Sequence, residues 1–205
     1  MEKIRIFIAI ELMQEIKENL RGIQEELKKA NADVKWVKPE NIHLTLKFMG
    51  SVPAQQIPEI AGELKSGLVR MDPLGTGFGF FSVEIAKVGS FPEKGKPRVI
   101  WAGVESGSED VIRLQGKVED SLKKFNFPGE DREYTPHLTV GRVKGPENIK
   151  VLQELLGVKS SVQFGRMLVE DVSIIRSDLK PDGPVYTTLE KILLEVQNGS
   201  KKVCK

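Results

Sequence analysis

The chain has 205 residues, which suits one large domain or two small lobes and is long enough to bury a sizeable core. Hydrophobic residues make up 40% and charged residues 29%, a balance that is typical of globular proteins and excludes a largely disordered chain. The 31 Lys and Arg residues against 29 Asp and Glu residues leave a net charge of +2, so a polyanion would have to bind at a local cluster of charge.

The chain has few features that would direct it out of the cytoplasm. Its only cysteine, Cys204, cannot form an internal disulfide, as expected for a reducing compartment. The apolar run 4–10 stops at Glu11 with no small-residue cleavage site after it. No segment approaches the roughly 18 consecutive apolar residues of a membrane helix. We therefore expect a cytoplasmic protein that does not contact a membrane.

Apolar periodicity and turn residues predict strands and helices interspersed along the chain. Helices are expected at 11–30, 55–69, 108–125 and 146–156, with Ser108 as the N-cap of the third. Strands are expected at 4–10, 34–37, 42–49, 83–88, 99–104, 135–143, 162–164, 167–176 and 185–194. Because several strands follow one another directly, the pattern predicts an α+β fold with antiparallel sheets.

A short internal repeat suggests how the elements are grouped. Residues 41–46 and 135–140 read alike, and each strand is followed by a glycine-containing break and then a helix. This order predicts two similar lobes of about 90 to 100 residues that face each other. We expect residues 1–195 to form this single two-lobed domain and residues 196–205 to form a polar C-terminal tail.

The repeat contains the only two histidines of the chain, each in the pattern His-Leu-Thr-aliphatic. The two strings are His43-Leu44-Thr45-Leu46 and His137-Leu138-Thr139-Val140. Side chains alternate between the faces of a strand, so each histidine shares a face with its threonine while the aliphatic residues point into the core. Two such strands would hold a phosphate between two hydroxyls, with one histidine near the attacking oxygen and the other near the leaving oxygen.

Other chemistries fit the sequence less well. Two histidines without a cysteine cluster make a poor zinc site, because catalytic zinc commonly has three protein ligands. A nucleophilic serine or cysteine in a recognisable setting is also missing, since Cys204 lies in the expected tail. A module that binds RNA ends without significant turnover remains the alternative from a different class of function.

Longer strings around the two motifs resemble the RNA 2′,3′-cyclic phosphodiesterase branch of the 2H phosphoesterase superfamily, which is also called the 2′-5′ RNA ligase family. These strings are residues 36–50 and 134–143, and residues 5–10 and 98–103 fit as well. The resemblance thus covers nearly the whole chain, and it implies two lobes whose motifs face each other across a central cleft. It implies hydrolysis of an RNA or nucleoside 2′,3′-cyclic phosphate to a 2′-phosphate, with no metal and no cofactor, and 2′-5′ ligation as the reverse reaction.

The resemblance also implies roles for the motif residues. His43 would donate a proton to the departing 3′ oxygen, and His137 would accept one from water. Thr45 and Thr139 would hold the non-bridging oxygens. The expected partner is RNA with a 2′,3′-cyclic phosphate end or a cyclic nucleotide, and the expected oligomeric state is a monomer.

Three further residues are candidates for substrate binding. Arg142 follows the second motif and could stabilise charge in the transition state. Strict alternation along the strand predicts Lys47 on the same face as His43 and Thr45, where it could touch phosphate. Phe48 could stack on a base, although packing in the core is its other interpretation.

Overall fold

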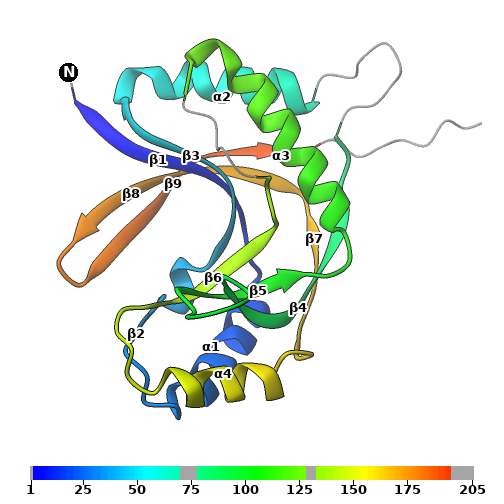
Figure 1. The fold of residues 1–205 in the computed structure, drawn as a ribbon. Helices are drawn as coiled ribbons and strands as arrows, with labels where there is room; N and C mark the ends of the chain where they lie inside the picture. Colours follow the sequence, from blue (N-terminus) through cyan, green and yellow to red (C-terminus); the bar gives the residue numbers. More distant parts are fainter. Residues whose placement is uncertain (1, 70–77, 128–132, 195–205) are drawn as a thin grey trace, which may run out of the picture.

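The computed structural model describes residues 2–69, 78–127 and 133–194. The strands are β1 (Lys3–Glu11), β2 (Val34–Trp36), β3 (His43–Pro53), β4 (Phe81–Phe91), β5 (Val99–Val104), β6 (His137–Val143), β7 (Gln163–Val169), β8 (Asp171–Lys180) and β9 (Gly183–Leu193). The helices are α1 (Gln14–Lys28), α2 (Ile57–Val69), α3 (Ser108–Leu122) and α4 (Ile149–Val158) (Figure 1). Three short 3₁₀ helices are η1 (Pro39–Asn41), η2 (Ala54–Gln56) and η3 (Lys123–Phe125).

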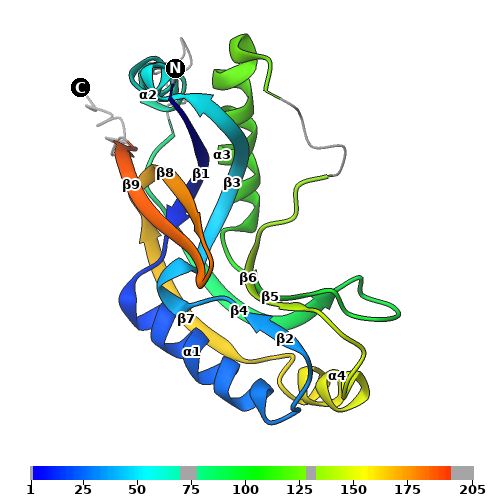
Figure 2. The ribbon, with the colours of Figure 1, turned by 90° about the vertical axis from the view of Figure 1, so that its left-hand side faces the viewer.

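The strands form one antiparallel sheet in the order β7-β4-β5-β6-β3-β1-β8-β9, and β2 pairs with β6 beside this path. The order is symmetric about the β6–β3 boundary. In each half the motif strand (β3 or β6) lies at the centre of the sheet, next to a strand that comes earlier in the chain (β1 or β5), and two further strands complete the half. The sheet is strongly curved between its two halves (Figure 2). The predicted α+β fold with two similar lobes is therefore confirmed, with the two antiparallel sheets joined into one.

The two lobes exchange their helices. Helix α1 follows β1 but packs against β7 and α4 in the other half of the sheet. Helix α3 follows β5 but packs against α2 and β3. Figure 1 accordingly shows α2 and α3 together at the top and α1 and α4 together at the bottom. Each lobe is thus assembled from distant parts of the chain, whereas the sequence repeat suggests two consecutive halves.

Several element boundaries differ from the prediction for local reasons. Helix α1 begins three residues late because Glu11 still belongs to β1, where it pairs with His43. The expected N-cap Ser108 is the first residue of α3, and Gly107 caps the helix in the left-handed region with φ +79°. A β-carbon on Gly107 would meet the carbonyl oxygen of Ser82 at 2.3 Å, so glycine is required there.

The strands also run differently from the prediction. Residues 50–53 do not end the strand but continue β3 along β1. Gly50 (φ +71°) stays paired with β1, next to a bulge in the ladder. Strand β4 starts at Phe81 and ends at Phe91, well beyond the expected 83–88. The expected strand 167–176 is in fact the end of β7 and the start of β8, separated at Glu170. The expected tail 196–205 lies outside the described residues.

The two faces of the sheet are different, and we name them by their contents. The core face carries Leu44 and Leu138 and packs with all four helices into one large hydrophobic core. The motif face carries the histidines and threonines of the two motifs. On the motif face, Phe7, Ala9 and Ile175 form a small separate cluster with Tyr186 against it. The helices therefore leave the motif face uncovered.

Candidate active site

The two motif strands lie next to each other at the centre of the sheet. Strands β3 and β6 are antiparallel, and Leu44 lies directly opposite Leu138. Because the strands run in opposite directions, this one pair places each motif histidine beside the threonine of the other motif. The facing pairs are His43 with Thr139 and Thr45 with His137.

The pairing sets the scale of the site. Directly opposite residues of an antiparallel pair have β-carbons about 4.5–5.5 Å apart, and diagonal neighbours are about 7–8 Å apart. His43 and His137 are diagonal neighbours, and so are Thr45 and Thr139, so the register brings all four residues together on the motif face. Tyr134, just before the second motif, donates its hydroxyl proton to the backbone oxygen of Thr45 over 2.8 Å and ties the motifs together.

Each histidine ring is oriented by a backbone carbonyl two residues upstream. Nδ1 of His43 lies 2.7 Å from the oxygen of Asn41, and Nδ1 of His137 lies 2.8 Å from the oxygen of Thr135. A carbonyl only accepts hydrogen bonds, so Nδ1 carries a proton in both rings. In both rings Nε2 is therefore the nitrogen left for a substrate or for water.

Aromatic rings enclose His43 more tightly than His137. Phe7 stacks on His43 with 4.5 Å between ring centroids and 25° between planes, and Tyr186 meets the same ring edge-on at 5.3 Å. His137 has one such neighbour, Phe91, which meets it edge-on at 5.2 Å. The side-chain amide of Asn41 donates to the carbonyl of Pro184 over 2.8 Å and holds β9, with its Tyr186, against this ring.

This enclosure changes the acidity of His43. Burial lowers the pKa of His43 from 6.5 to about 4, and the positive charge of Lys17 acts in the same direction. The Asn41 carbonyl and the carboxylate of Glu11 oppose the shift without cancelling it. In the free protein the His43 ring is consequently neutral at pH 7.

The low pKa of His43 predicts a loss of stability in mild acid. Between pH 6.5 and about 4 the unfolded chain binds a proton at this residue and the folded protein does not, so the free energy of unfolding falls as the pH drops. From pH 7 to pH 5 the contribution is roughly 2 kcal/mol. Urea unfolding at pH 7 and pH 5 measures this loss in free energy of unfolding. In the His43→Gln variant the loss should be smaller than in the wild-type protein by this amount. Equal losses in the wild-type protein and the variant would contradict the assignment.

Glu11 is a charged neighbour of this ring that the sequence did not single out. It lies opposite His43 in the β1–β3 ladder, and its Oε1 accepts hydrogen bonds from Ser173 (2.6 Å) and Thr188 (3.1 Å). Burial acts to raise the pKa of Glu11, but these hydroxyls and the charge of Lys191 lower it overall. Glu11 therefore stays ionised at neutral pH beside the neutral His43.

The prediction that Lys47 shares the motif face is wrong. In the β1–β3 ladder Ala9 pairs with Thr45 but Ile8 pairs with Lys47, so one extra residue, Leu46, forms a bulge. The bulge reverses the alternation and turns Lys47 to the core face. There its side chain is only 3% exposed, and Nζ pairs with Glu119 of α3 at 2.7 Å.

The same bulge occurs in the second motif, with Val140 as the extra residue between Thr139 and Gly141. The six residues from each histidine onward show the same sequence of burial, so the repeat is structural as well as sequential. Beyond the bulges, Phe48 and Arg142 occupy equivalent positions on the motif face. Phe48 is 51% exposed and lies 6.0 Å from the ring of Phe7, and Arg142 is also exposed.

The new position of Lys47 gives a prediction about stability. Removing Glu119 leaves a buried ammonium without its carboxylate, and breaking a buried pair from one side is costly. Since Glu119 is itself 29% exposed, we expect Glu119→Ala to lower the free energy of unfolding by about 2–3 kcal/mol. Lys47→Met, which fills the same space without a charge, should cost less. Urea unfolding measures both losses. A larger loss for Lys47→Met than for Glu119→Ala would contradict the buried pair.

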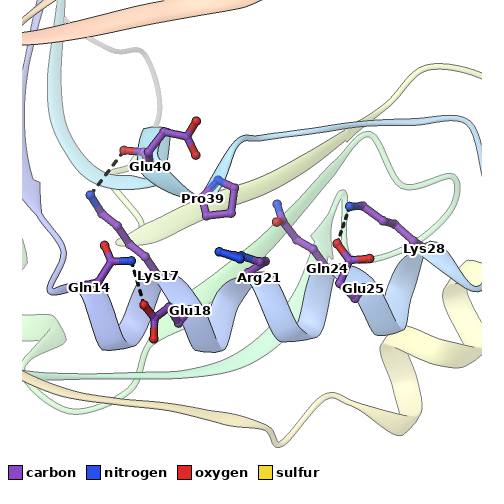
Figure 3. Close-up of a pocket in the computed structure, with 9 residues that line it drawn as sticks. All are labelled: Gln14, Lys17, Glu18, Arg21, Gln24, Glu25, Lys28, Pro39 and Glu40. Carbon is purple, nitrogen blue, oxygen red and sulfur yellow. Dashed lines mark hydrogen bonds and ion pairs between the residues drawn. The ribbon is translucent and has the colours of Figure 1, made fainter.

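A surface pocket lies behind the first motif rather than in it. It is formed by one side of α1 and the η1 segment, and none of its lining residues belongs to a motif (Figure 3). Lys17 crosses it and donates to the carbonyl of Glu40 over 3.4 Å. This contact braces the segment whose next residue, Asn41, orients His43.

Within residues 2–69, 78–127 and 133–194, no group of three or more His, Cys, Asp and Glu residues could hold a metal ion. No helix there is both long and apolar enough to span a membrane.

The sequence missed the residues that surround the motif histidines. Phe7 and Tyr186 come from β1 and β9, and only the strand order brings them to His43. Phe7 sits in a run of apolar residues that predicts a fully buried strand, so nothing local distinguished it from its neighbours. Phe7 lies on the same face of β1 as Glu11, because the two are an even number of residues apart. The sequence alone does not show that Glu11 faces His43, so it could not assign Phe7 to the motif face.

Comparison with known proteins agrees with this arrangement. The family model described as LigT like Phosphoesterase matches residues 10–101 and again 103–186, once in each half of the chain. The RNA 2′,3′-cyclic phosphodiesterase of Methanothermobacter thermautotrophicus is 41% identical over 188 residues, which cover 92% of this chain and 97% of that protein. The protein of the same name from Archaeoglobus fulgidus is 37% identical over 91% and 98% of the two chains.

Solved structures give the same result for the fold. The crystal structure of TT0787 from Thermus thermophilus has a TM-score of 0.76 and 31% identity, and the match covers 94% of this chain and 99% of that one. Escherichia coli LigT in complex with 3′-AMP has a TM-score of 0.70 over 94% and 99% of the chains, and at 22% identity this likeness concerns the fold alone. With a family match in both halves and relatives above 30% identity along nearly its whole length, the chain belongs to the LigT-like phosphoesterase family.

Proposed function

We propose that this protein hydrolyses the 2′,3′-cyclic phosphate at an RNA end to a 2′-phosphate, with His43 and His137 as its acid and base. The single observation that carries the proposal is the pairing of Leu44 with Leu138, which makes the two motifs neighbours on one face. The names of the relatives at 41% and 37% identity support the same reaction.

The reaction follows from the orientation of the two rings. Nε2 of His137 accepts a proton from a water molecule as its oxygen attacks phosphorus. The bond from phosphorus to the 3′ oxygen breaks, and Nε2 of His43 donates the proton that makes this oxygen a hydroxyl. Thr45 and Thr139 donate hydrogen bonds to the non-bridging oxygens. Each acid or base group of this kind commonly contributes about 10²–10⁴-fold in rate.

The donor role of His43 requires that the ring gain a proton when substrate binds. With a pKa of about 4 it is neutral in the free protein at pH 7. A phosphate anion within about 4–6 Å favours the charged imidazolium and raises the pKa. The chain has only two histidines, so a proton NMR titration can follow His43 without overlap. We expect saturating inorganic phosphate to raise the pKa of His43 by about one unit or more. An unchanged pKa in the presence of bound phosphate would contradict the assignment of His43 as the proton donor.

The remaining candidates for substrate binding are the residues beyond the two bulges. We infer that Arg142 adds positive charge for the RNA end and that Phe48 stacks on a base, and the exposure of both side chains supports these roles. Lys47 is not among them, because it is buried on the core face. That the protein works as a monomer in the cytoplasm stays a prediction.

The decisive experiment is product analysis with excess EDTA present. Purified protein is incubated with a nucleoside 2′,3′-cyclic phosphate, and phosphorus NMR identifies the product. We expect turnover to a 2′-phosphate that EDTA does not reduce. A 3′-phosphate product, or activity lost to EDTA, would contradict the proposed mechanism.

Two related functions give different outcomes in the same experiment. An RNA-end binding module would retain RNA with a cyclic end unchanged. A ligase would consume the cyclic end only when RNA with a 5′-hydroxyl is added, and the ratio of ligated to hydrolysed product measures the balance between the two reactions.

A further inference from the structure

Two positive side chains face each other on the motif face beside the proposed site. Lys35 of β2 pairs with Arg142 of β6 in the antiparallel ladder, and both are exposed. Paired residues in such a ladder point to the same side of the sheet, and like charges directly opposite each other are destabilising. The pair is therefore a local concentration of positive charge in a chain whose net charge is only +2.

Neither positive side chain of this pair is held by a carboxylate of the described residues. Within the described ranges, neither Lys35 nor Arg142 takes part in an ion pair or a side-chain hydrogen bond. Other exposed cations do find carboxylates on distant elements, as Lys65 does with Glu190 at 2.9 Å and Lys87 with Glu105 at 2.9 Å. Two uncompensated cations a short distance apart favour an anion that can touch both.

The position of this pair relates it to the phosphate held by the motifs. Arg142 and Thr139 are partners of Val99 and Trp101 in β5, two positions apart, so they are separated by about 7 Å along the strand. Arg142 also acts across the motif face. Burial raises the pKa of the Tyr186 hydroxyl, and the charges of Arg142 and Arg5 oppose that rise. The charge of Arg142 is thus close enough to act on the Tyr186 hydroxyl of the first lobe.

We propose that Lys35, together with Arg142, binds the phosphodiester on the 5′ side of the nucleotide that carries the cyclic phosphate. The inference rests on the proposed function and specifies its substrate. An RNA end has this second phosphate one nucleotide away from the reacting one, whereas a cyclic mononucleotide lacks it. The preferred substrate is then an oligonucleotide end, and Lys35 is a binding residue without a part in proton transfer.

The test compares two substrates that differ by one nucleotide on the 5′ side. One is cytidine 2′,3′-cyclic phosphate, and the other is the CpC dinucleotide with the same cyclic end. The ratio of their kcat/KM values measures the contribution of the added nucleotide, and the Lys35 variants isolate the part that comes from its phosphate. Because a hydrogen bond between two charged groups is lost, Lys35→Met should lower this ratio about tenfold, and Lys35→Arg should preserve it. The slope of log kcat/KM against log salt for the dinucleotide should become shallower by about 0.7 in Lys35→Met.

Lys117→Met provides the matched control. Lys117 is exposed on α3, on the other side of the sheet, so this variant loses the same charge far from the motif face and should keep the wild-type ratio. A ratio unchanged by Lys35→Met, or lowered equally by Lys117→Met, would overturn the inference. If the wild-type protein turned over neither substrate, the proposed function itself would be refuted. Failure of the inference and failure of the proposed function are therefore distinguishable.

Discussion

Replacing His43 or His137 by alanine is expected to lower kcat for a 2′,3′-cyclic phosphate by about 10²–10⁴-fold in each case. The reason is that a backbone carbonyl holds Nδ1 of each ring, which leaves Nε2 as the nitrogen that can exchange a proton with substrate or water. The double variant should lose little more than the worse single variant, because an acid and a base that act in one step are not additive. Kinetics under saturating substrate check this result.

The control for the histidine variants is stability. His137→Ala should melt close to the wild-type temperature, whereas His43→Ala also removes a ring that stacks on Phe7 at 4.5 Å. Turnover must therefore be measured well below the melting point of each variant. Near wild-type turnover in either folded variant would mean that the corresponding ring is not the acid or the base.

Replacing Thr45 or Thr139 by valine is expected to lower kcat by about 10²–10³-fold, the usual result of removing one donor that stabilises charge in a transition state. Valine keeps the shape of threonine and its preference for a strand, so the hydroxyl is the main loss. Each threonine faces the histidine of the other motif, so both substitutions should act on kcat more than on KM. Steady-state kinetics at several substrate concentrations separate the two constants.

Thr187→Val is the matched control for this pair. Thr187 is an exposed strand residue on β9, next to Tyr186 in sequence but on the opposite side of the strand. Its substitution should change neither constant by more than about twofold, within the range of ordinary surface changes. A similar loss in Thr187→Val would show that valine acts by disturbing the sheet.

The two lobes are alike in backbone and unlike in the side chains beyond their bulges. The first lobe offers Phe48 beside the ring of Phe7, and the second offers Arg142 beside Lys35. A phosphate between the lobes would thus have an aromatic surface on one side and positive charge on the other. Under the proposed function, this difference would orient the RNA end in an otherwise symmetric site.

The sequence by itself determined the parts that depend on local pattern. The repeated His-Leu-Thr strings, the alternation of strand residues and the spacing of apolar residues in the helices predicted the lobes and the motif residues. The spacing in α1 is an example, since Ile16, Leu20, Ile23 and Leu27 are all buried. The family resemblance then supplied the reaction, which relatives along the whole chain support.

Only the tertiary structure decided which residues join the motifs. One extra residue in each ladder reverses the alternation, so Lys47 turns into the core and Phe48 and Arg142 turn to the site. A bulge has no reliable signal in a single strand, because it is a property of two strands in register. The acidity of His43 likewise depends on burial by Phe7 and Tyr186, which are brought together only by the strand order.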